Sequence, residues 1–261
     1  VGEFAGLDTV RQLAVNAGIE PRPPAYPSVY LGACETTLRR LTAAYTVFAN
    51  AGVRRQSYLI ERIDDASDRP VYRAAHIESP VLDPGVAWLT TRALREVIEL
   101  GTGSAASSLG VDFPAAGKTG TTDNYADAWF LGFTSSLTCG VWVGMDDSRT
   151  IMGRGYGSTL ALPVWSAVMA AAPKNRYPAD PFESPVDTRS VQLCRESGQL
   201  ARAGCRASGT SYSTRLPTTM VPRRACLIHR DQPPSRPAQP GEPGRFRPGD
   251  IFDAIRDLFG G

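Results

Sequence analysis

Histidine, excess charge and long apolar runs are all scarce in this sequence, and each shortage excludes a class of function. The 261 residues include 2 histidines and carry 28 basic against 26 acidic side chains, a formal net charge of +2. Such a small basic excess argues against a nucleic acid partner, because binding along a phosphate backbone needs many cations. No apolar run approaches the roughly 20 residues that a membrane-spanning helix needs, and no signal-peptide pattern opens the chain.

The two histidines, His76 and His229, have no partner at the spacing of a catalytic triad or of a paired-histidine metal site. We therefore expect surface or packed histidines and no Ser-His-Asp hydrolase. Asp146 and Asp147 follow an apolar stretch and are interpreted as a solvated turn rather than as metal ligands. The sequence accordingly predicts no metal site and no cofactor.

Length and composition are those of a folded protein. With 42% hydrophobic and 21% charged residues, 261 residues are enough for one large domain or two small ones. The chain begins with Val1 and passes directly into a stretch with helical periodicity. We expect it to be a piece of a longer protein.

The five cysteines fall into two groups. Cys34 and Cys139 lie in apolar stretches, where a free cysteine usually serves as a small core residue. Cys194, Cys205 and Cys226 lie in a loop-rich C-terminal third, with no CxxC pair and no paired histidines. This pattern favours one disulfide plus a leftover thiol over zinc. A disulfide in turn indicates an oxidising compartment.

Four segments carry apolar residues at helical spacing: 1–18, 37–51, 84–99 and 160–172. Asp83 and Pro84 form an N-cap and first-turn pair for the third of these helices.

Two hairpins are predicted between these helices. Residues 57–63 and 71–72 form the first, around a polar turn, and residues 128–134 and 137–145 form the second, joined by two serines. In the second hairpin apolar side chains alternate to both faces, so helices must cover the sheet on both sides. The sequence therefore predicts an α+β fold, a mainly antiparallel sheet with helices on both faces.

The amino-acid composition changes after Pro173, where Pro, Arg, Ser and Gly become frequent. We predict a main domain over residues 1–175 and a cysteine-containing appendage over 176–230. A proline-rich linker follows over 231–249, and a short amphipathic tail occupies 250–261.

The motif that carries chemistry lies at residues 117–122, Gly-Lys-Thr-Gly-Thr-Thr. It is not a phosphate-binding loop, because that motif needs a glycine five positions before Gly117 and the chain has Asp112 there. The alternative is the Lys-Thr-Gly strand of serine acyl-transfer enzymes. Strand alternation places Thr119 and Thr121 on one face, with Lys118 on the other but long enough to reach round. A cation and two hydroxyls side by side suit a substrate carboxylate.

A resemblance to the end of the transpeptidase domain of class A penicillin-binding proteins is carried by the run GKTGTTDNYADAWFLGFTSSLTCGVWVGMDD. The helix before that motif in the family resembles YLGACETTLRRLTAAYTVFANAG, and the closing helix resembles LALPVWSAVM. The family's cysteine-bearing tail is similar to CRESGQLARAGC followed by CLIH. The resemblance covers residues 1–229 and implies the penicillin-binding protein fold, with a five-stranded sheet.

The resemblance implies a peptidoglycan D,D-transpeptidase that acts on D-Ala-D-Ala stem peptides and is acylated by β-lactams. It assigns catalytic roles to Lys118, which holds the substrate carboxylate and tunes the proton network, and to Thr121, whose N–H joins the oxyanion hole. It assigns substrate binding to Thr119, Gly120 and Thr122. Implied partners are stem peptides, β-lactams and the rest of the parent chain, including a glycosyltransferase domain, on the extracytoplasmic side of a bacterial envelope.

Two elements of the family pattern are missing. No serine is followed by Lys three positions later or by Asn two positions later. We expect the nucleophile to lie upstream in the parent protein and this chain alone to be inactive. The alternative is a non-catalytic binding or scaffolding remnant of the same fold.

Overall fold

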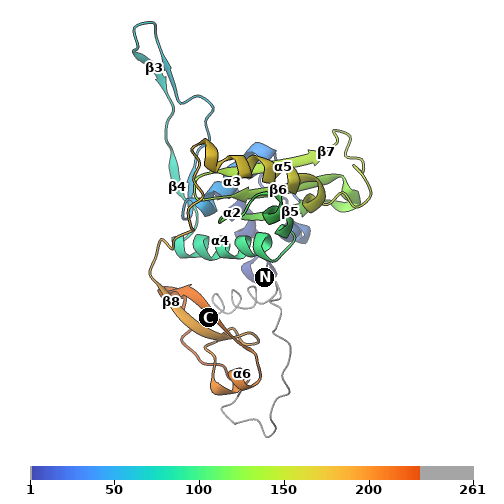
Figure 1. The fold of residues 1–261 in the computed structure, drawn as a ribbon, viewed down its shortest axis with the longest axis vertical. Helices are drawn as coiled ribbons and strands as arrows, with labels where there is room; N and C mark the ends of the chain where they lie inside the picture. Colours follow the sequence, from blue (N-terminus) through green and yellow to red (C-terminus); the bar gives the residue numbers. More distant parts are fainter. Residues whose placement is uncertain (1, 230–261) are drawn as a thin grey trace. The chain divides into compact units, whose positions relative to one another are not determined.

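The computed structural model describes residues 2–229, which divide between two compact units (Figure 1). One unit is Leu7–Glu183; the other is Val1–Gly6 with Ser184–Gly261. The expected linker at 231–249 and tail at 250–261 lie outside the described residues. Within residues 2–229, every helix falls short of the length and apolar character needed to cross a bilayer.

The larger unit is built around a three-stranded antiparallel sheet in the order β5-β6-β7. Its strands are β5 (Ala116–Thr121), β6 (Asp127–Phe133) and β7 (Thr138–Gly144). The predicted aromatic hairpin is confirmed as β6 and β7, which pair from Asp127↔Gly144 to Phe133↔Thr138. The described residues supply three strands to this sheet, where the family resemblance implied five.

The two-serine turn of this hairpin is held by the residue that precedes it. The hydroxyl of Thr134 accepts hydrogen bonds from the N–H groups of Ser136 at 3.3 Å and Leu137 at 3.2 Å. The backbone N–H of Thr134 also donates to the carbonyl of Leu137 at 2.8 Å. Thr134 is 1% exposed, so its hydroxyl satisfies turn N–H groups that water reaches poorly.

Helices pack on both faces of the sheet, as the alternation in β6 predicted. On one face, the ring of Trp165 in α5 (Gly157–Ala171) lies 4.7 Å from that of Phe130. On the other, Phe48 of α3 (Leu38–Ala49) stacks on Phe133 with ring centroids 6.5 Å apart. A third helix, α4 (Pro84–Glu99), packs against β5 and α3. The fold is therefore α+β with a covered antiparallel sheet.

The helices approach the sheet where glycine leaves room. A Cβ added to Gly132 would lie 2.5 Å from the Trp165 ring and 2.9 Å from the carbonyl oxygen of Ala116. A Cβ added to Gly140, on the opposite face, would clash with Thr42 of α3. Since ordinary contacts begin near 3.4 Å, either helix would have to move away from any larger residue.

Several boundaries differ from the expected ones. The predicted helix over 1–18 is two helices, α1 (Gly2–Ala5) and α2 (Leu7–Ala17), because Gly6 adopts φ +84° and interrupts the hydrogen-bond ladder. Helix α5 begins at Gly157, earlier than the expected residue 160, and Pro163 lies inside it. The predicted helix at 84–99 is confirmed, with Asp83 accepting from the N–H of Gly85 at 2.8 Å.

The remaining strands of the larger unit form two small antiparallel ladders. Strand β1 (Val53–Arg55) pairs with β4 (Glu78–Pro80), and β2 (Arg62–Asp64) pairs with β3 (Pro70–Arg73). In Figure 1 they form a long arm with β3 near its tip. The predicted strand at 57–63 was wrong over most of its length, because only its last two residues pair and the side chain of Leu59 is 93% exposed.

The smaller unit contains the hairpin β8 (Thr188–Cys194) and β9 (Ser211–Pro217), with α6 (Ala203–Ala207) between the two strands. Its three cysteines are free thiols, which corrects the expectation of one disulfide plus one thiol. Short 3-10 helices complete the two units at Pro27–Leu31, Ser104–Leu109, Asp123–Tyr125, Pro173–Asn175 and Thr218–Met220.

The contact between α5 and the sheet gives a stability prediction. Gly132→Ala should lower the free energy of unfolding by about 1–3 kcal/mol, because the added methyl group meets the Trp165 ring and a backbone carbonyl. Gly153→Ala is the matched control, since a Cβ there has no atom within 4 Å, and it should change stability by less than about 0.5 kcal/mol. Urea unfolding followed by tryptophan fluorescence measures both. Equal stability of the two variants would contradict this account of the packing.

Candidate functional site

The Lys-Thr-Gly segment lies where strand β5 leaves the core. Ala116 and Gly117 are buried, Thr119 and Gly120 are half-buried, and Lys118 and Thr121 are exposed. Among the described strands, β5 pairs only with β6. One edge of the segment is therefore unpaired by the strands of residues 2–229, and an extended peptide can align along such an edge.

Lys118 is directed along its own strand. Its Nζ donates a hydrogen bond to the carbonyl oxygen of Thr119 at 2.8 Å. The side chain is exposed, yet neighbouring protein atoms remove part of the water around the ammonium group, and this desolvation lowers the pKa of Lys118 from its ordinary value. The site thus presents a partly desolvated cation, which binds an anion more strongly than a fully hydrated one does.

The hydroxyl of Thr119 meets a second threonine that the sequence analysis did not single out. Thr102, which follows α4, has its Oγ1 2.8 Å from the Oγ1 of Thr119. One hydroxyl donates and the other accepts, so the pair orients both groups. No local sequence signal points to Thr102, because 17 residues separate it from Thr119.

Thr121 connects the strand to the start of α5. Its Oγ1 accepts a hydrogen bond from the backbone N–H of Gly157, the first residue of that helix, at 3.0 Å. A Cβ on Gly157 would come within 2.6 Å of the carbonyl oxygen of Gly120, so only glycine permits this approach. Thr119 and Thr121 both lie on the face expected from alternation, and each hydroxyl already has a partner within the protein.

Thr122 is used in the turn that follows the strand. Its hydroxyl accepts from the backbone N–H of Asp127 at 2.8 Å and donates to the Asp127 carboxylate at 3.0 Å. The indole N–H of Trp142 donates to the other oxygen of that carboxylate at 2.8 Å. Asp127 is therefore occupied in closing the loop between β5 and β6, and the Thr122 side chain stabilises the same turn.

Two tyrosines lie beside this turn. The hydroxyl groups of Tyr125 and Tyr156 are 3.2 Å apart, and their rings meet edge to face with centroids 5.1 Å apart. Tyr156 directly precedes α5 and its side chain is exposed. The pair places apolar surface and hydroxyl groups next to the Lys-Thr-Gly segment.

A cavity of about 270 Å³ in the same unit does not include these residues. It is lined in part by Glu20, Arg39, Arg40 and Arg54. The charge there is partly neutralised, because Arg40 pairs with Glu20 at 3.3 Å. We place the candidate site at the exposed segment of β5, where the cation and hydroxyls are adjacent.

The assembled groups can bind an anion and donate hydrogen bonds, but they include no activated nucleophile. The chain has two lysines, Lys118 and Lys174, and neither follows a serine at the spacing of a Ser-x-x-Lys motif.

Within residues 2–229, the groups that could ligate a metal are Cys194, Cys205, Cys226 and His229, in the smaller unit. The sequence predicted a surface or packed histidine and no metal site; the His229 side chain is indeed mostly buried, but it lies among three cysteines. The signal that could have identified this group is the spacing of three residues between Cys226 and His229.

Known proteins resemble this chain over much of its length. The family model described as the transpeptidase domain of penicillin-binding proteins matches residues 24–170. Penicillin-binding protein 1A of Neisseria lactamica is 37% identical over 178 residues, which cover 66% of this chain and 22% of that protein. Penicillin-binding protein 1A of Aquifex aeolicus is 35% identical over 200 residues, covering 77% of this chain and 27% of that protein. The chain therefore spans about a quarter of the length of these relatives.

Solved structures show the same fold. Penicillin-binding protein 1A of Haemophilus influenzae superposes with a TM-score of 0.74 at 23% identity, covering 86% of this chain and 38% of that one. A penicillin-binding protein of Mycobacterium tuberculosis gives a TM-score of 0.60 at 23% identity, covering 70% and 53%. Because the family model covers more than half of the residues and the fold agrees, this chain belongs to the penicillin-binding protein transpeptidase family.

Proposed function

We propose that this chain is the C-terminal part of a peptidoglycan D,D-transpeptidase and supplies its Lys-Thr-Gly substrate-binding strand. The observation that carries the proposal is that β5 leaves the core between Lys118 and Thr121, both exposed, at an edge of the sheet that the described strands leave unpaired. A buried strand could bind no substrate, whereas this one presents a cation and hydroxyls together.

The proposed ligand is the carboxylate at the D-Ala-D-Ala end of a stem peptide. Lys118 would supply the positive charge, and the Thr119 hydroxyl, held by Thr102 at 2.8 Å, would donate to the carboxylate. Gly120 lets β5 and β6 lie close together at this point, since a Cβ there would approach the Trp129 Cβ to 3.1 Å. The stem peptide would lie extended along β5 and pair with its backbone.

The proposed reaction is acyl transfer in two steps. A serine oxygen attacks the carbonyl carbon between the two D-Ala residues, an ester forms, and the terminal D-Ala leaves with a proton on its nitrogen. The amine of a second stem peptide then attacks the ester, forms the cross-linking amide and returns the serine hydroxyl. The N–H of Thr121 would stabilise the oxyanion in both steps, with the backbone of Thr122 continuing the binding strand. A β-lactam would acylate the same serine.

That serine is proposed to lie upstream in the parent chain, because residues 1–261 contain no Ser-x-x-Lys or Ser-x-Asn motif. The parent protein would also carry a glycosyltransferase domain and an anchor. It would act on the extracytoplasmic side of a bacterial cell envelope, and no cofactor is needed for the proposed chemistry.

The second candidate is a binding or scaffolding remnant that keeps the fold but has lost its chemistry. The missing serine motifs favour it, and the coding sequence upstream of Val1 discriminates the two. A Ser-x-x-Lys followed by a Ser-x-Asn upstream supports the transpeptidase, and their absence supports the remnant.

The isolated chain, residues 1–261, should not form a covalent adduct with a fluorescent penicillin, because it lacks the nucleophile. Gel fluorescence after denaturation measures this, with the full-length parent as the positive control. A label on the isolated chain that survives denaturation would show that a nucleophile lies within these residues, contrary to the proposal.

In the full-length parent, Lys118→Ala should lower the second-order rate of β-lactam acylation by about 10²–10³-fold, the loss typical of a transition-state electrostatic contact. The melting temperature should change little, because the Lys118 side chain is exposed. Lys174→Ala is the matched control, since Lys174 is the other lysine and is also exposed, and it should acylate at the wild-type rate. Equal acylation rates in the two variants would show that Lys118 has no role in the site.

The lowered pKa of Lys118 predicts a pH effect in the same parent protein. Carboxylate binding needs the ammonium form, so acylation should decline as the pH rises through this lowered pKa, earlier than for an ordinary lysine. In the Lys118→Arg variant the side chain stays charged over the whole pH range of the assay. The acylation rate of this variant should therefore show no decline at alkaline pH, even where it is lower than that of the wild type. If the acylation rates of the wild type and of Lys118→Arg decline identically at alkaline pH, Lys118 is not the group that binds the carboxylate.

A further inference from the structure

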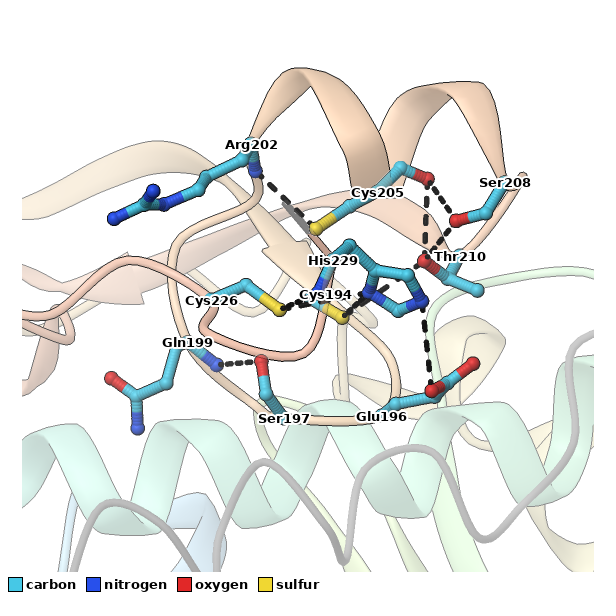
Figure 2. Close-up of polar contacts among 10 residues, drawn as sticks. All are labelled: Cys194, Glu196, Ser197, Gln199, Arg202, Cys205, Ser208, Thr210, Cys226 and His229. Atoms are coloured by element: carbon cyan, nitrogen blue, oxygen red, sulfur yellow. Dashed lines mark hydrogen bonds and ion pairs between the residues drawn. The ribbon is translucent and has the colours of Figure 1, made fainter. Parts of the chain in front are cut away.

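Three cysteines and one histidine converge in the smaller unit (Figure 2). The sulfur atoms of Cys194, Cys205 and Cys226 and a ring nitrogen of His229 all lie within 4.8 Å of one another. All three cysteines are 0% exposed, and the His229 side chain is 17% exposed. These four residues, here called the Cys3His cluster, have no part in the proposed acyl transfer.

The backbone holds each cysteine in place from a different element. Cys194 ends β8, and its N–H donates to the carbonyl of Gln199 at 2.9 Å. Cys205 lies in α6, and its carbonyl accepts from the N–H of Thr210 at 2.9 Å. The N–H of Cys226 donates to the carbonyl of Leu200 at 2.8 Å. The cluster is therefore set by ladder and turn hydrogen bonds rather than by flexible side chains alone.

The sulfur atoms also accept backbone hydrogen bonds. The N–H of Arg202 points to the Sγ of Cys205 at 3.4 Å, and the N–H of His229 points to the Sγ of Cys226 at 3.5 Å. A hydrogen bond to sulfur favours the thiolate over the thiol, and the thiolate is the form that binds metal. Both contacts are thus those expected around metal-bound cysteines.

The histidine is oriented with one nitrogen inward and the other outward. Its Nδ1 lies 3.4 Å from the Sγ of Cys194 and 3.6 Å from the Sγ of Cys226. Its Nε2 lies 3.6 Å from a carboxylate oxygen of Glu196. A carboxylate behind the outer nitrogen is the usual support for a metal-bound imidazole, because it fixes the ring and its tautomer.

We propose that the Cys3His cluster binds a structural Zn²⁺. Zn–S bonds of about 2.3 Å and Zn–N bonds of about 2.0–2.1 Å in a tetrahedron place neighbouring ligand atoms about 3.5–3.8 Å apart, close to the 3.4 and 3.6 Å between His229 and two of the sulfurs. Four protein ligands close the coordination shell, which is typical of a structural rather than a catalytic zinc. The three thiols would release their protons on binding.

A disulfide accounts less well for the same residues. It would join two of the sulfurs at about 2.05 Å and leave the third thiol and the inward-facing imidazole nitrogen with no role. Sulfur-rich sets with one imidazole suit zinc rather than the oxygen-preferring cations. The geometry therefore points to one ion shared by all four residues.

The cluster forms a buried centre of the smaller unit with little apolar packing around it. Apart from the three cysteines, its packing partner among the described hydrophobic residues is the partly buried Ala201. Domains of only a few tens of residues cannot bury enough apolar surface on their own, and a metal commonly supplies the missing stability. Zinc would thus hold β8, α6 and the Cys226 segment together.

The test uses residues 1–261 purified under reducing conditions with zinc and then desalted. Elemental analysis should give about one zinc per chain, and Co²⁺ substitution should give the intense visible bands of a tetrahedral thiolate site. Cys205→Ser and His229→Ala should weaken binding in a chelator competition by more than about 100-fold, since even losing a supporting residue costs about 10–100-fold. Glu196→Gln, which changes a supporting residue, should weaken zinc binding by about 10–100-fold.

Three further variants keep the outcome interpretable. His229→Cys should retain one metal, which separates loss of a ligand from misfolding. His76→Ala and Cys139→Ser, which change the other histidine and a cysteine of the larger unit, should bind as the wild type does. The proposal is overturned if zinc is substoichiometric and mass spectrometry finds a disulfide among the three cysteines. It is overturned equally if His229→Ala binds zinc with wild-type affinity.

Discussion

The burial of strand β6 on both faces is the constraint on which the larger unit depends. Phe130 packs against Trp165 on one side, and Phe133 stacks on Phe48 on the other. Such packing requires helices close to the sheet, and Gly132 and Gly140 leave the necessary space. Because interiors are packed at crystal-like density, the register of the sheet and the positions of the helices are determined together.

The same packing decides where the candidate site begins. The register sets Gly117 opposite Gly132, where the sheet is still covered, and Thr121 opposite Ala128, where β5 has become exposed. Cation and hydroxyls therefore reach solvent on a strand whose other end is fixed in the core. Binding groups on such a rigid element keep their geometry without ordering costs when a substrate arrives.

The two units differ in what holds them together. The larger one has an aromatic and aliphatic cluster around Phe130, Leu162 and Trp165. The smaller one, rich in polar and small residues, centres on the Cys3His cluster instead. With the proposed zinc bound, the stability of the smaller unit would depend on metal supply and redox state, whereas that of the larger unit depends on the hydrophobic effect.

The sequence by itself determined the features that depend on near neighbours: the helix capped by Asp83, the aromatic hairpin around Thr134, and the alternation of Thr119 and Thr121. Only the tertiary structure decided which distant groups meet. Thr102 joins Thr119, the start of α5 joins Thr121, and His229 joins Cys194 from 35 residues away. Periodicity and caps report on residues within a turn or two, whereas these contacts arise when separate elements pack, and nothing in local spacing encodes them.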